Sequence, residues 1–428
     1  MKLPGTLLKI LLVVPLCGVA MSFAESILIK NTRIETMTAQ GRLDDTDLLI
    51  VDGRISLMAK NLSAPDARII DGRGKRVTPG VFNAFTQMGL VEISGIDQTL
   101  DFSVVHEEYS ASLHVIDAFN PHSTAIPQNR IHGVTRVLVA PEAPESLFAG
   151  VAAIVNLSGS IQDSVELRSV GVVVNYNEHG QEKIGGSRAA ALASIRHALR
   201  DAREYAQNKQ VYLGGEGREL SLSFADLDAL VPVINKQQYL IVLVERSSDI
   251  LQILSLAESM DIKVILKGAQ EGWMVARQIA QAQTPVIIDP IFNLPTQFET
   301  LGSRLENAQI LDREGVVLLF TGMGWQGTHN AYLVTQSAGN AVANGLPYAS
   351  ALKAIFRNPA VVFDLDPPGQ IVPGEIADLV LWSGDPLELL REAELVMVDG
   401  QQVSMTSRAT QLRDRYYERL RDELVESR

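Results

Sequence analysis

Apolar and polar positions alternate along the part of the chain that follows residue 25. Residues 26–30 show this pattern, and apolar runs at 47–51 and 54–58 flank the dipeptide Asp52-Gly53. Apolar runs on either side of Asp-Gly are a strong signal for a β-hairpin. A further strand is expected at 67–72. Segment 25–78 is therefore predicted to consist of short strands joined by tight turns.

The middle of the chain contains runs in which most residues are apolar. These runs lie at 134–140, 170–174, 239–244, 262–266 and 316–320. Strands this apolar are buried on both faces and are typical of parallel sheets covered by helices. Helical spacing is found between and after them, at 187–206, 248–254 and 271–281. The alternation predicts an α/β protein with a (β/α)8 TIM-like barrel over 79–368, interrupted by irregular insertions.

One stretch stands at the predicted start of this barrel. The apolar run Val77-Thr78-Pro79-Gly80 continues into Val81-Phe82-Asn83-Ala84-Phe85-Thr86-Gln87. An apolar run that passes through Pro-Gly into small and polar residues is the pattern of a buried strand opening at a cavity. The stretch resembles the first barrel strand of the amidohydrolase superfamily, especially its imidazolonepropionase-like exported bacterial members. In that family the same Pro-Gly leads into Asp-Ala-His-Thr-His, and the two histidines hold the catalytic metal.

A second block near the C-terminus carries the same resemblance. The run Gly374-Glu375-Ile376-Ala377-Asp378-Leu379 and the later Val396-Met397-Val398-Asp399-Gly400 are similar to the C-terminal signature of the superfamily. There the chain returns to complete a small β-sandwich beside the barrel. The resemblance implies that 25–78 and 369–406 form such a sandwich together. The charged stretch 407–428 is predicted to be a terminal helix.

The metal ligands of the superfamily are replaced at the positions that match. Phe85 and Gln87 stand where the first strand carries its histidines, and Leu243 or Glu245 stands at the fifth-strand position. Lys267 occupies the sixth-strand position and Gly322 the position of the eighth-strand aspartate. Phenylalanine has no lone pair for a metal, and an amide oxygen is a poor ligand for zinc. Because zinc-type activation of water needs about three protein ligands, we expect no metal.

A pocket is still expected at the carboxyl ends of the barrel strands, since losing ligands does not fill the space. The candidate pocket residues are Asn83, Phe85, Gln87, Glu245, Lys267, Gly322, Trp325 and His329. No catalytic residue is assigned. A buried lysine needs a carboxylate partner or a lowered pKa, so a Lys267–Glu245 ion pair is the hypothesis for the polar centre. The alternative is that Lys267 points to solvent.

The seven histidines supply no replacement metal site by sequence. No two of them have the i, i+4 spacing of a helical metal clip. The best local clusters are His106-Glu107-Glu108 and Glu178-His179, which are expected to be loop residues in hydrogen bonds. His329 follows the glycine-rich segment 322–327 and is expected near the mouth of the pocket. A single histidine cannot replace three ligands.

The N-terminus has the features of a secretory signal peptide over residues 1–24. Lys2 and Lys9 supply positive charge, the run 10–16 is apolar, and Ser22-Phe23-Ala24 fits a cleavage site. Cleavage after Ala24 predicts a periplasmic or secreted protein without a membrane attachment; the alternative is an uncleaved anchor. Cys17 is the only cysteine, so the mature chain would lack thiol chemistry, cysteine-bound zinc and disulfides.

Charge and composition limit the classes of function that the chain can have. The chain has 428 residues, 46% of them hydrophobic and 20% charged, and its formal net charge of −13 disfavours nucleic acid as a partner. Two interpretations remain. In the first, an exported amidohydrolase relative without catalysis binds a small molecule, or partners an active paralogue or another copy of itself. In the second, the chain is an active hydrolase of non-peptide carbon–nitrogen bonds, in cyclic amides, imides or dipeptide-like substrates, with an atypical site. Zinc is expected as a cofactor only in this second interpretation.

Overall fold

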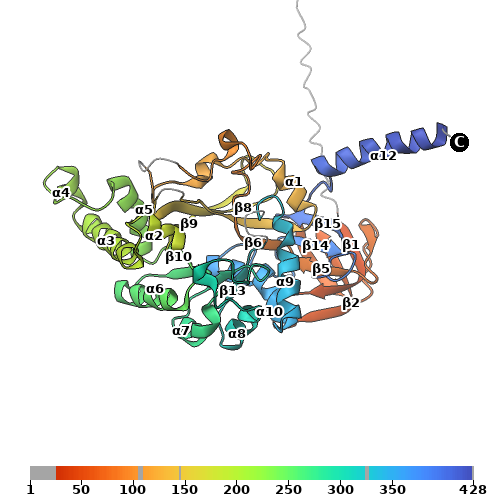
Figure 1. Ribbon diagram of the computed structural model, residues 1–428. Helices are drawn as coiled ribbons and strands as arrows, with labels where there is room; N and C mark the ends of the chain where they lie inside the picture. Colours follow the sequence, from red (N-terminus) through yellow and green to blue (C-terminus); the bar gives the residue numbers. More distant parts are fainter. Residues whose placement is uncertain (1–25, 105–108, 144–145, 323–326, 427–428) are drawn as a thin grey trace, which may run out of the picture.

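The computed structural model describes residues 26–104, 109–143, 146–322 and 327–426. The predicted signal peptide and its Cys17, together with Trp325, lie outside the described residues. Two sheets organise the described chain, one beside the other, with helices around the larger sheet (Figure 1). None of the helices in the described ranges has the length and apolar character needed to cross a membrane.

Strands from both ends of the described chain form the first sheet, in the order β16-β15-β14-β5-β1-β2-β3, with β4 paired to β1. Its strands are β1 (Ile27–Glu35), β2 (Arg42–Val51), β3 (Arg54–Ala59), β4 (Arg68–Asp71), β5 (Arg76–Pro79), β14 (Leu379–Trp382), β15 (Ala393–Val398) and β16 (Gln401–Gln402). The Asp52-Gly53 turn joins β2 to β3, as its sequence predicts. The two ends meet where β5 pairs with β14 in antiparallel register.

The second sheet contains eight strands in sequence order and is nearly closed. They are β6 (Val81–Thr86), β7 (Val134–Val139), β8 (Phe148–Asn156), β9 (Val165–Asn175), β10 (Tyr239–Val244), β11 (Val264–Gly268), β12 (Val286–Ile288) and β13 (Leu318–Phe320). The first and last strands approach each other at their carboxyl ends, where Thr321 Oγ1 donates a hydrogen bond to the Phe85 carbonyl at 2.9 Å. This barrel sheet places its strand ends around one space.

The sheet departs from a regular (β/α)8 pattern at β8. This strand runs antiparallel to both β7 and β9, whereas the other neighbouring pairs are parallel. The connections around β8 contain eight residues each, 140–147 and 157–164, which is too short for a crossover helix. The sequence pattern did not reveal β8 because its centre, Ala149-Gly150-Val151-Ala152-Ala153, is made largely of small residues.

Helices cover the outside of the barrel sheet and connect its strands. The α-helices are α1 (Ala125–Arg130), α2 (Glu178–Glu182), α3 (Arg188–Gln207), α4 (Lys209–Leu213), α5 (Phe224–Ile234), α6 (Ser247–Met260), α7 (Ala276–Gln281), α8 (Asn307–Arg313), α9 (Val334–Ala343), α10 (Tyr348–Phe356), α11 (Asn358–Phe363) and α12 (Arg408–Glu426). Short 3-10 turns include η1 (Asp97–Thr99), η2 (Val115–Ala118), η3 (Gly272–Val275), η4 (Phe298–Thr300) and η6 (Ala331–Leu333). The helical stretches expected at 187–206 and 248–254 correspond to α3 and α6, and 271–281 divides into η3 and α7.

The interior of the barrel is filled at one end. Phe82, Ile241 and Leu319 project inward from three strands and are at most 3% exposed. Phe363 of α11 closes this end, with its ring centroid 6.4 Å from that of Phe82. Apolar packing therefore occupies the amino-terminal end of the barrel, and open space remains only toward the carboxyl ends of the strands.

A buried charge cluster joins the barrel to the end sheet. Arg136 of β7 is 4% exposed, and its guanidinium forms ion pairs with Glu166 of β9, at 2.6 Å, and with Asp378. Asp378 lies in the C-terminal signature and also accepts a hydrogen bond from Thr135 Oγ1 at 3.0 Å. Burial raises the pKa of the Asp378 carboxyl, because the charged form is desolvated. The cation of Arg136 opposes this increase in pKa at Asp378 and also at Glu166.

The two signature stretches meet at this cluster. The Gly80 amide donates to the Asp378 carbonyl at 3.1 Å. A Cβ added at Gly80 would lie 2.0 Å from Thr135 Oγ1, so this position accepts only glycine without a rearrangement. Gly80 and Asp378 thus both contact Thr135 of β7.

Replacing Arg136 by methionine should lower the free energy of unfolding by about 3–5 kcal/mol, because Glu166 and Asp378 would stay buried without a counter-charge. Urea unfolding of the variant and the wild type measures the difference. Arg168→Met is the matched control: its ion pair with Asp117 is exposed on both sides, so the loss should stay below about 1 kcal/mol. Equal losses in the two variants would contradict the structural role given to Arg136.

Candidate functional site

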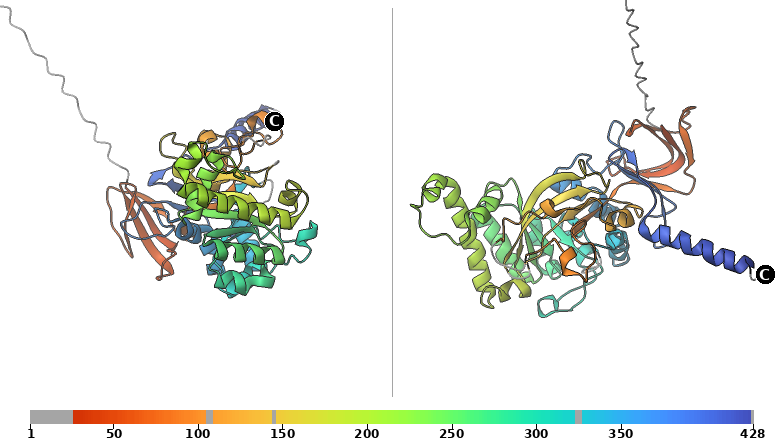
Figure 2. Two further views of the ribbon diagram at one scale, coloured as in Figure 1. Left: turned by 90° about the vertical axis from the view of Figure 1, so that its left-hand side faces the viewer. Right: turned by 90° about the horizontal axis from the view of Figure 1, so that it is seen from above.

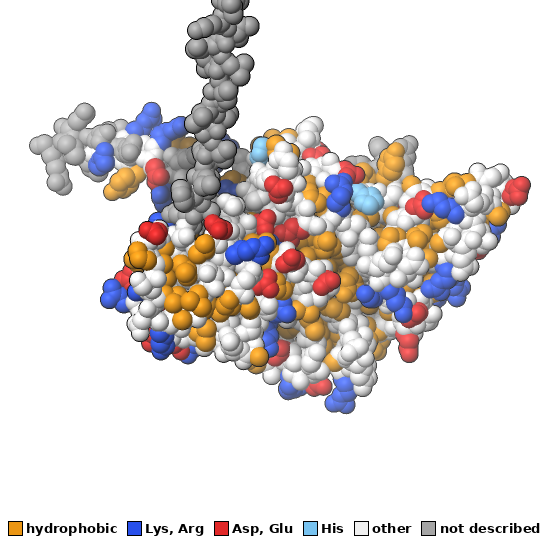
Figure 3. Space-filling model, turned by 180° about the vertical axis from the view of Figure 1, so that it is seen from behind, with side chains coloured by type: hydrophobic (Ala, Val, Ile, Leu, Met, Phe, Trp, Pro, Cys, Tyr) orange, Lys and Arg blue, Asp and Glu red, His pale blue; other side chains and the backbone are white. Residues whose placement is uncertain are grey.

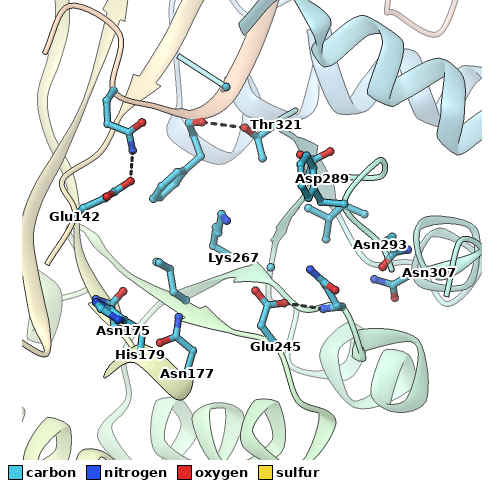
Figure 4. Close-up of a pocket in the computed structure, with 18 of the residues that line it drawn as sticks. Glu142, Asn175, Asn177, His179, Glu245, Lys267, Asp289, Asn293, Asn307 and Thr321 are labelled. Atoms are coloured by element: carbon cyan, nitrogen blue, oxygen red, sulfur yellow. Dashed lines mark hydrogen bonds between the residues drawn. The ribbon is translucent and has the colours of Figure 1, made fainter. Parts of the chain in front are cut away.

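A cavity of about 580 Å³ lies at the carboxyl ends of the barrel strands. Residues that follow or end the strands form most of its wall (Figure 4). The polar and charged members are Gln87, Glu142, Asn175, Asn177, His179, Glu245, Lys267, Gln270, Asp289, Asn293, Asn307 and Thr321. The apolar members include Phe85, Leu243, Ile288 and Phe292. The wall is thus rich in amides and carboxylates around one lysine.

The parallel register of three central strands places Lys267 at the centre of the cavity. Asn175 of β9 pairs with Leu243 of β10, which pairs with Lys267 of β11. Residues in register on parallel strands share one face of the sheet, here the inner face. Lys267 points into the space between Glu142 and Glu245, and its Nζ lies 5.3 Å from the centre of the Phe85 ring (Figure 4). This distance allows a cation–π contact.

The expected Lys267–Glu245 ion pair is not formed at contact distance. Among the described residues, no carboxylate oxygen lies within the 4.0 Å of an ion pair from Lys267 Nζ. Glu245 is instead held against the end of β11, where its Oε2 accepts a hydrogen bond from the Gln270 amide at 3.1 Å. Gly268 makes room for it, since a Cβ there would lie 2.1 Å from Glu245 Oε1. Lys267 also does not point to bulk solvent, which was the alternative, because its side chain lines the cavity.

Burial strongly changes the pKa of the Glu245 carboxyl. Desolvation raises the pKa of its carboxyl from 4.5 to about 7, and the positive charge of Lys267 only partly opposes this. Glu142 lies at the accessible mouth of the cavity. Its pKa is also raised, chiefly because the surrounding wall desolvates it, again with Lys267 opposing. The carboxyl of Glu245 therefore changes its charge close to neutral pH.

Gln87 is fixed by hydrogen bonds on both sides of its amide. Its Nε2 donates to Glu142 Oε1 at 3.1 Å, and its Oε1 accepts from Thr328 Oγ1 at 2.8 Å. The Gln87 backbone amide donates to the same Thr328 hydroxyl at 3.0 Å. The Gln87 side chain is therefore part of a hydrogen-bonded wall.

Three of the expected pocket residues lie outside the cavity lining. Asn83 is buried, and its side chain donates to the Ala331 carbonyl at 3.0 Å. Gly322 packs against α9, where a Cβ would lie 2.5 Å from Ser337 Oγ. The ring of His329 contacts Ser94 Oγ at 2.9 Å on the protein surface. Asn83 lies away from the cavity although it is two residues from Phe85, because the pairing of β6 with β7 is irregular between Asn83 and Thr86. Gly322 and His329 lie beyond the end of β13, where the alternation of a strand does not apply.

Several wall residues were not expected from the sequence. Glu142 follows β7, Asn175 ends β9, and Asp289 directly follows β12. A polar residue at the end of an apolar strand was the available signal for each of them. Asp289 was missed because β12 has only three residues and was not recognised as a strand. His179, on α2, was considered only as a loop residue.

Comparisons with known proteins agree with the motif resemblance. No family model matches the chain. An amidohydrolase from Thermotoga maritima has a structure that aligns with a TM-score of 0.78 and 25% sequence identity, covering 88% of this chain and 99% of its own. The chain is a member of the amidohydrolase superfamily.

More distant matches give weaker support for the family. A prolidase complexed with N-methylphosphonate-L-proline aligns with a TM-score of 0.53 and 15% identity over 89% of this chain and 99% of its own, which shows the shared fold alone. In sequence, a dihydroorotase from Bacillus cytotoxicus is 39% identical over 61 residues. This match spans 14% of each protein, so the chain covers only a small part of the dihydroorotase.

The donor chemistry of this amidohydrolase relative does not fit the metal that the superfamily fold implies. The matching positions present an aromatic ring at Phe85, a hydrogen-bonded amide at Gln87 and an ammonium at Lys267. A cation at the centre of a site repels a second cation. Within the described ranges, no three histidine, cysteine, aspartate or glutamate side chains are grouped so that they could hold a metal ion.

The free energy of unfolding should decrease as the pH rises from about 4.5 to about 7, because of Glu245. In that range the folded carboxyl keeps a proton that the unfolded one has lost. The stabilisation that the protonated Glu245 carboxyl gives to the folded state is complete below pH 4.5 and is lost as the pH passes the folded pKa. Between the two pKa values the free energy of unfolding falls by at most about 1.4 kcal/mol per pH unit.

Urea unfolding at several pH values, compared between the wild type and Glu245→Gln, measures this contribution. The difference between the two should change with pH in the stated direction. Glu216→Gln, which alters an exposed glutamate, is the control. A difference between the wild type and Glu245→Gln that is constant from pH 4.5 to 7 would contradict the assignment.

Proposed function

We propose that this chain is a metal-independent, non-catalytic member of the amidohydrolase superfamily that binds a small molecule in the cavity around Lys267. The observation that carries the proposal is the pair formed by Lys267 and Phe85, an ammonium above an aromatic ring where relatives bind a metal. Fold membership alone does not confer the reaction, which depends on the residues of the site. The barrel is, in this proposal, a (β/α)8 barrel modified at its third strand.

The charges of the wall favour a ligand that carries both signs. Glu142, Glu245 and Asp289 surround a single cationic side chain, Lys267. A purely anionic ligand would be repelled by these three carboxylates, whereas a cationic group of a ligand could approach Glu142. The ammonium of Lys267 is available to an anionic group, since no described carboxylate contacts it. The amide side chains suit the peptide-like part of a small zwitterion, such as a dipeptide.

Export is part of the proposal, on the strength of residues 1–24. The protein would act in the periplasm or outside the cell, alone, with an active paralogue or with another copy of itself.

Chain recovered from the periplasm without a histidine tag should begin at Glu25 and contain no stoichiometric zinc, manganese or iron. N-terminal sequencing and elemental analysis measure the two properties. Stoichiometric metal that remains after dialysis against a chelator would overturn the metal-independent part.

Calorimetry with three probes tests the ligand class. The zwitterion Ala-Ala should bind more tightly than N-acetyl-Ala-Ala, which lacks the cation, and Ala-Ala amide, which lacks the anion. Lys267→Met should reduce the affinity for Ala-Ala by at least about tenfold, since a charge-assisted contact contributes about 1.5 kcal/mol or more. Lys353→Met, outside the cavity lining, is the control. Equal affinity for the three probes, or no binding of any, would contradict the proposal.

One observation favours the alternative of an active hydrolase with an atypical site. The pKa of Glu245, about 7, suits a general base or acid at neutral pH. Cleavage of Ala-Ala or of a cyclic amide by the purified chain, followed by mass spectrometry and abolished in Glu245→Gln, would establish that function instead.

A further inference from the structure

Helix α12 leaves the body of the protein after a well-defined start. The Ser407 amide donates to Thr410 Oγ1 at 2.9 Å, and the Thr410 amide donates to Ser407 Oγ at 3.3 Å, which caps the first turn. From there the helix extends away from both sheets (Figures 1 and 2). Apart from Glu418, whose side chain is not described, every side chain from 411 to 421 is exposed. Most helical stability in proteins comes from the packing of an amphipathic face, so α12 would gain from a partner.

An apolar stripe runs along one face of α12. Leu412, Tyr416 and Leu420 are spaced by four residues and therefore lie on one side of the helix. Their exposed fractions are 37%, 55% and 59%, and the neighbouring Tyr417 is 67% exposed. The projecting helix is visible at the edge of the space-filling view (Figure 3). A continuous stripe of this kind is the pattern of a helix that packs against another element.

The charges of α12 are arranged against its own dipole. The first half of the helix carries Arg408, Arg413 and Arg415 with only Asp414, and the second half carries Glu418, Asp422, Glu423 and Glu426 with Arg419 and Arg421. The first turn contains no acidic residue and the last turn no basic one. A helix is stabilised by anions at its N-terminus and cations at its C-terminus, so this distribution is unfavourable in an isolated helix.

We propose that α12 pairs with α12 of a second copy of this chain in antiparallel orientation. Such a pair covers the stripe of Leu412, Tyr416 and Leu420 in each copy. It also places the basic first half of one helix beside the acidic second half of the other, and each helix end receives the charge that its dipole favours. The pairing is two-fold symmetric, with the axis near Tyr416.

The proposed interface is small, because one helix from each copy supplies it. We therefore expect a reversible dimer that forms at micromolar concentration. The proposal does not depend on the function proposed for the cavity, since α12 contributes no residue to the cavity wall.

Sedimentation velocity of the mature chain over a range of concentrations tests the self-association. The average mass should rise toward that of a dimer, and Leu420→Glu should raise the dissociation constant by at least about tenfold. Gln411→Glu, on the opposite face of α12, adds the same charge and should not have this effect. A wild type that is monomeric at all concentrations, or variants that behave alike, would overturn the proposal.

Cysteine cross-linking tests the orientation in chains that carry Cys17→Ser. Tyr416→Cys, close to the two-fold axis, should form a disulfide between copies when a mild oxidant is added. Ala409→Cys should not, because its two copies would be about 20 Å apart along the helix axis at 1.5 Å per residue. Cross-linking at both positions would indicate a parallel pair and contradict the antiparallel arrangement. Binding to anionic lipid vesicles by a chain that stays monomeric would assign the stripe to a membrane surface and overturn the proposal.

Discussion

The burial of Arg136 between Glu166 and Asp378 is the interaction on which the arrangement of the two sheets depends. A guanidinium removed from water is strongly destabilising unless carboxylates surround it, and one of those carboxylates comes from the far end of the chain. The burial of Arg136 on β7 therefore depends on the C-terminal segment as well as on the barrel. The two stretches that resemble the signature of one family, nearly 300 residues apart, meet here: Gly80 and Asp378 contact each other, and both contact Thr135 of β7.

The shape and the charge of the cavity are set by different parts of the barrel. The strand ends still converge on one volume, because their positions are set by packing in the lower barrel around Phe82 and Phe363. At the centre of this volume Lys267 contributes a cation, 5.3 Å from the centre of the Phe85 ring. The carboxylates around it are not paired with it directly, and burial keeps Glu245 poised between its two charge states near neutral pH. The lining of the cavity thus carries carboxylates on either side of one ammonium group.

The sequence predicted those features that depend on local pattern. The Asp52-Gly53 hairpin, the apolar strands β7 and β10 and the helices α3 and α6 follow from turn chemistry and periodicity. It could not reveal that β8 is reversed, because strand direction depends on the length of connections between elements whose bounds were unknown. The same reason applies within the site. Lys267 and Glu245 were placed at neighbouring strand ends, yet whether they touch depends on the space left by Gly268 and on the amide of Gln270, which a linear pattern does not contain.

The junction between the first and last barrel strands has a mechanical consequence. In the described residues no ladder of backbone hydrogen bonds links β13 to β6, and the bond from Thr321 to the Phe85 carbonyl crosses the gap. A fully paired ring resists widening, whereas a wall with an unpaired seam can yield locally at little cost. Phe85 and Thr321 flank this seam and also line the cavity. Among the described residues, one wall of the cavity is therefore closed by a side-chain hydrogen bond and not by strand pairing.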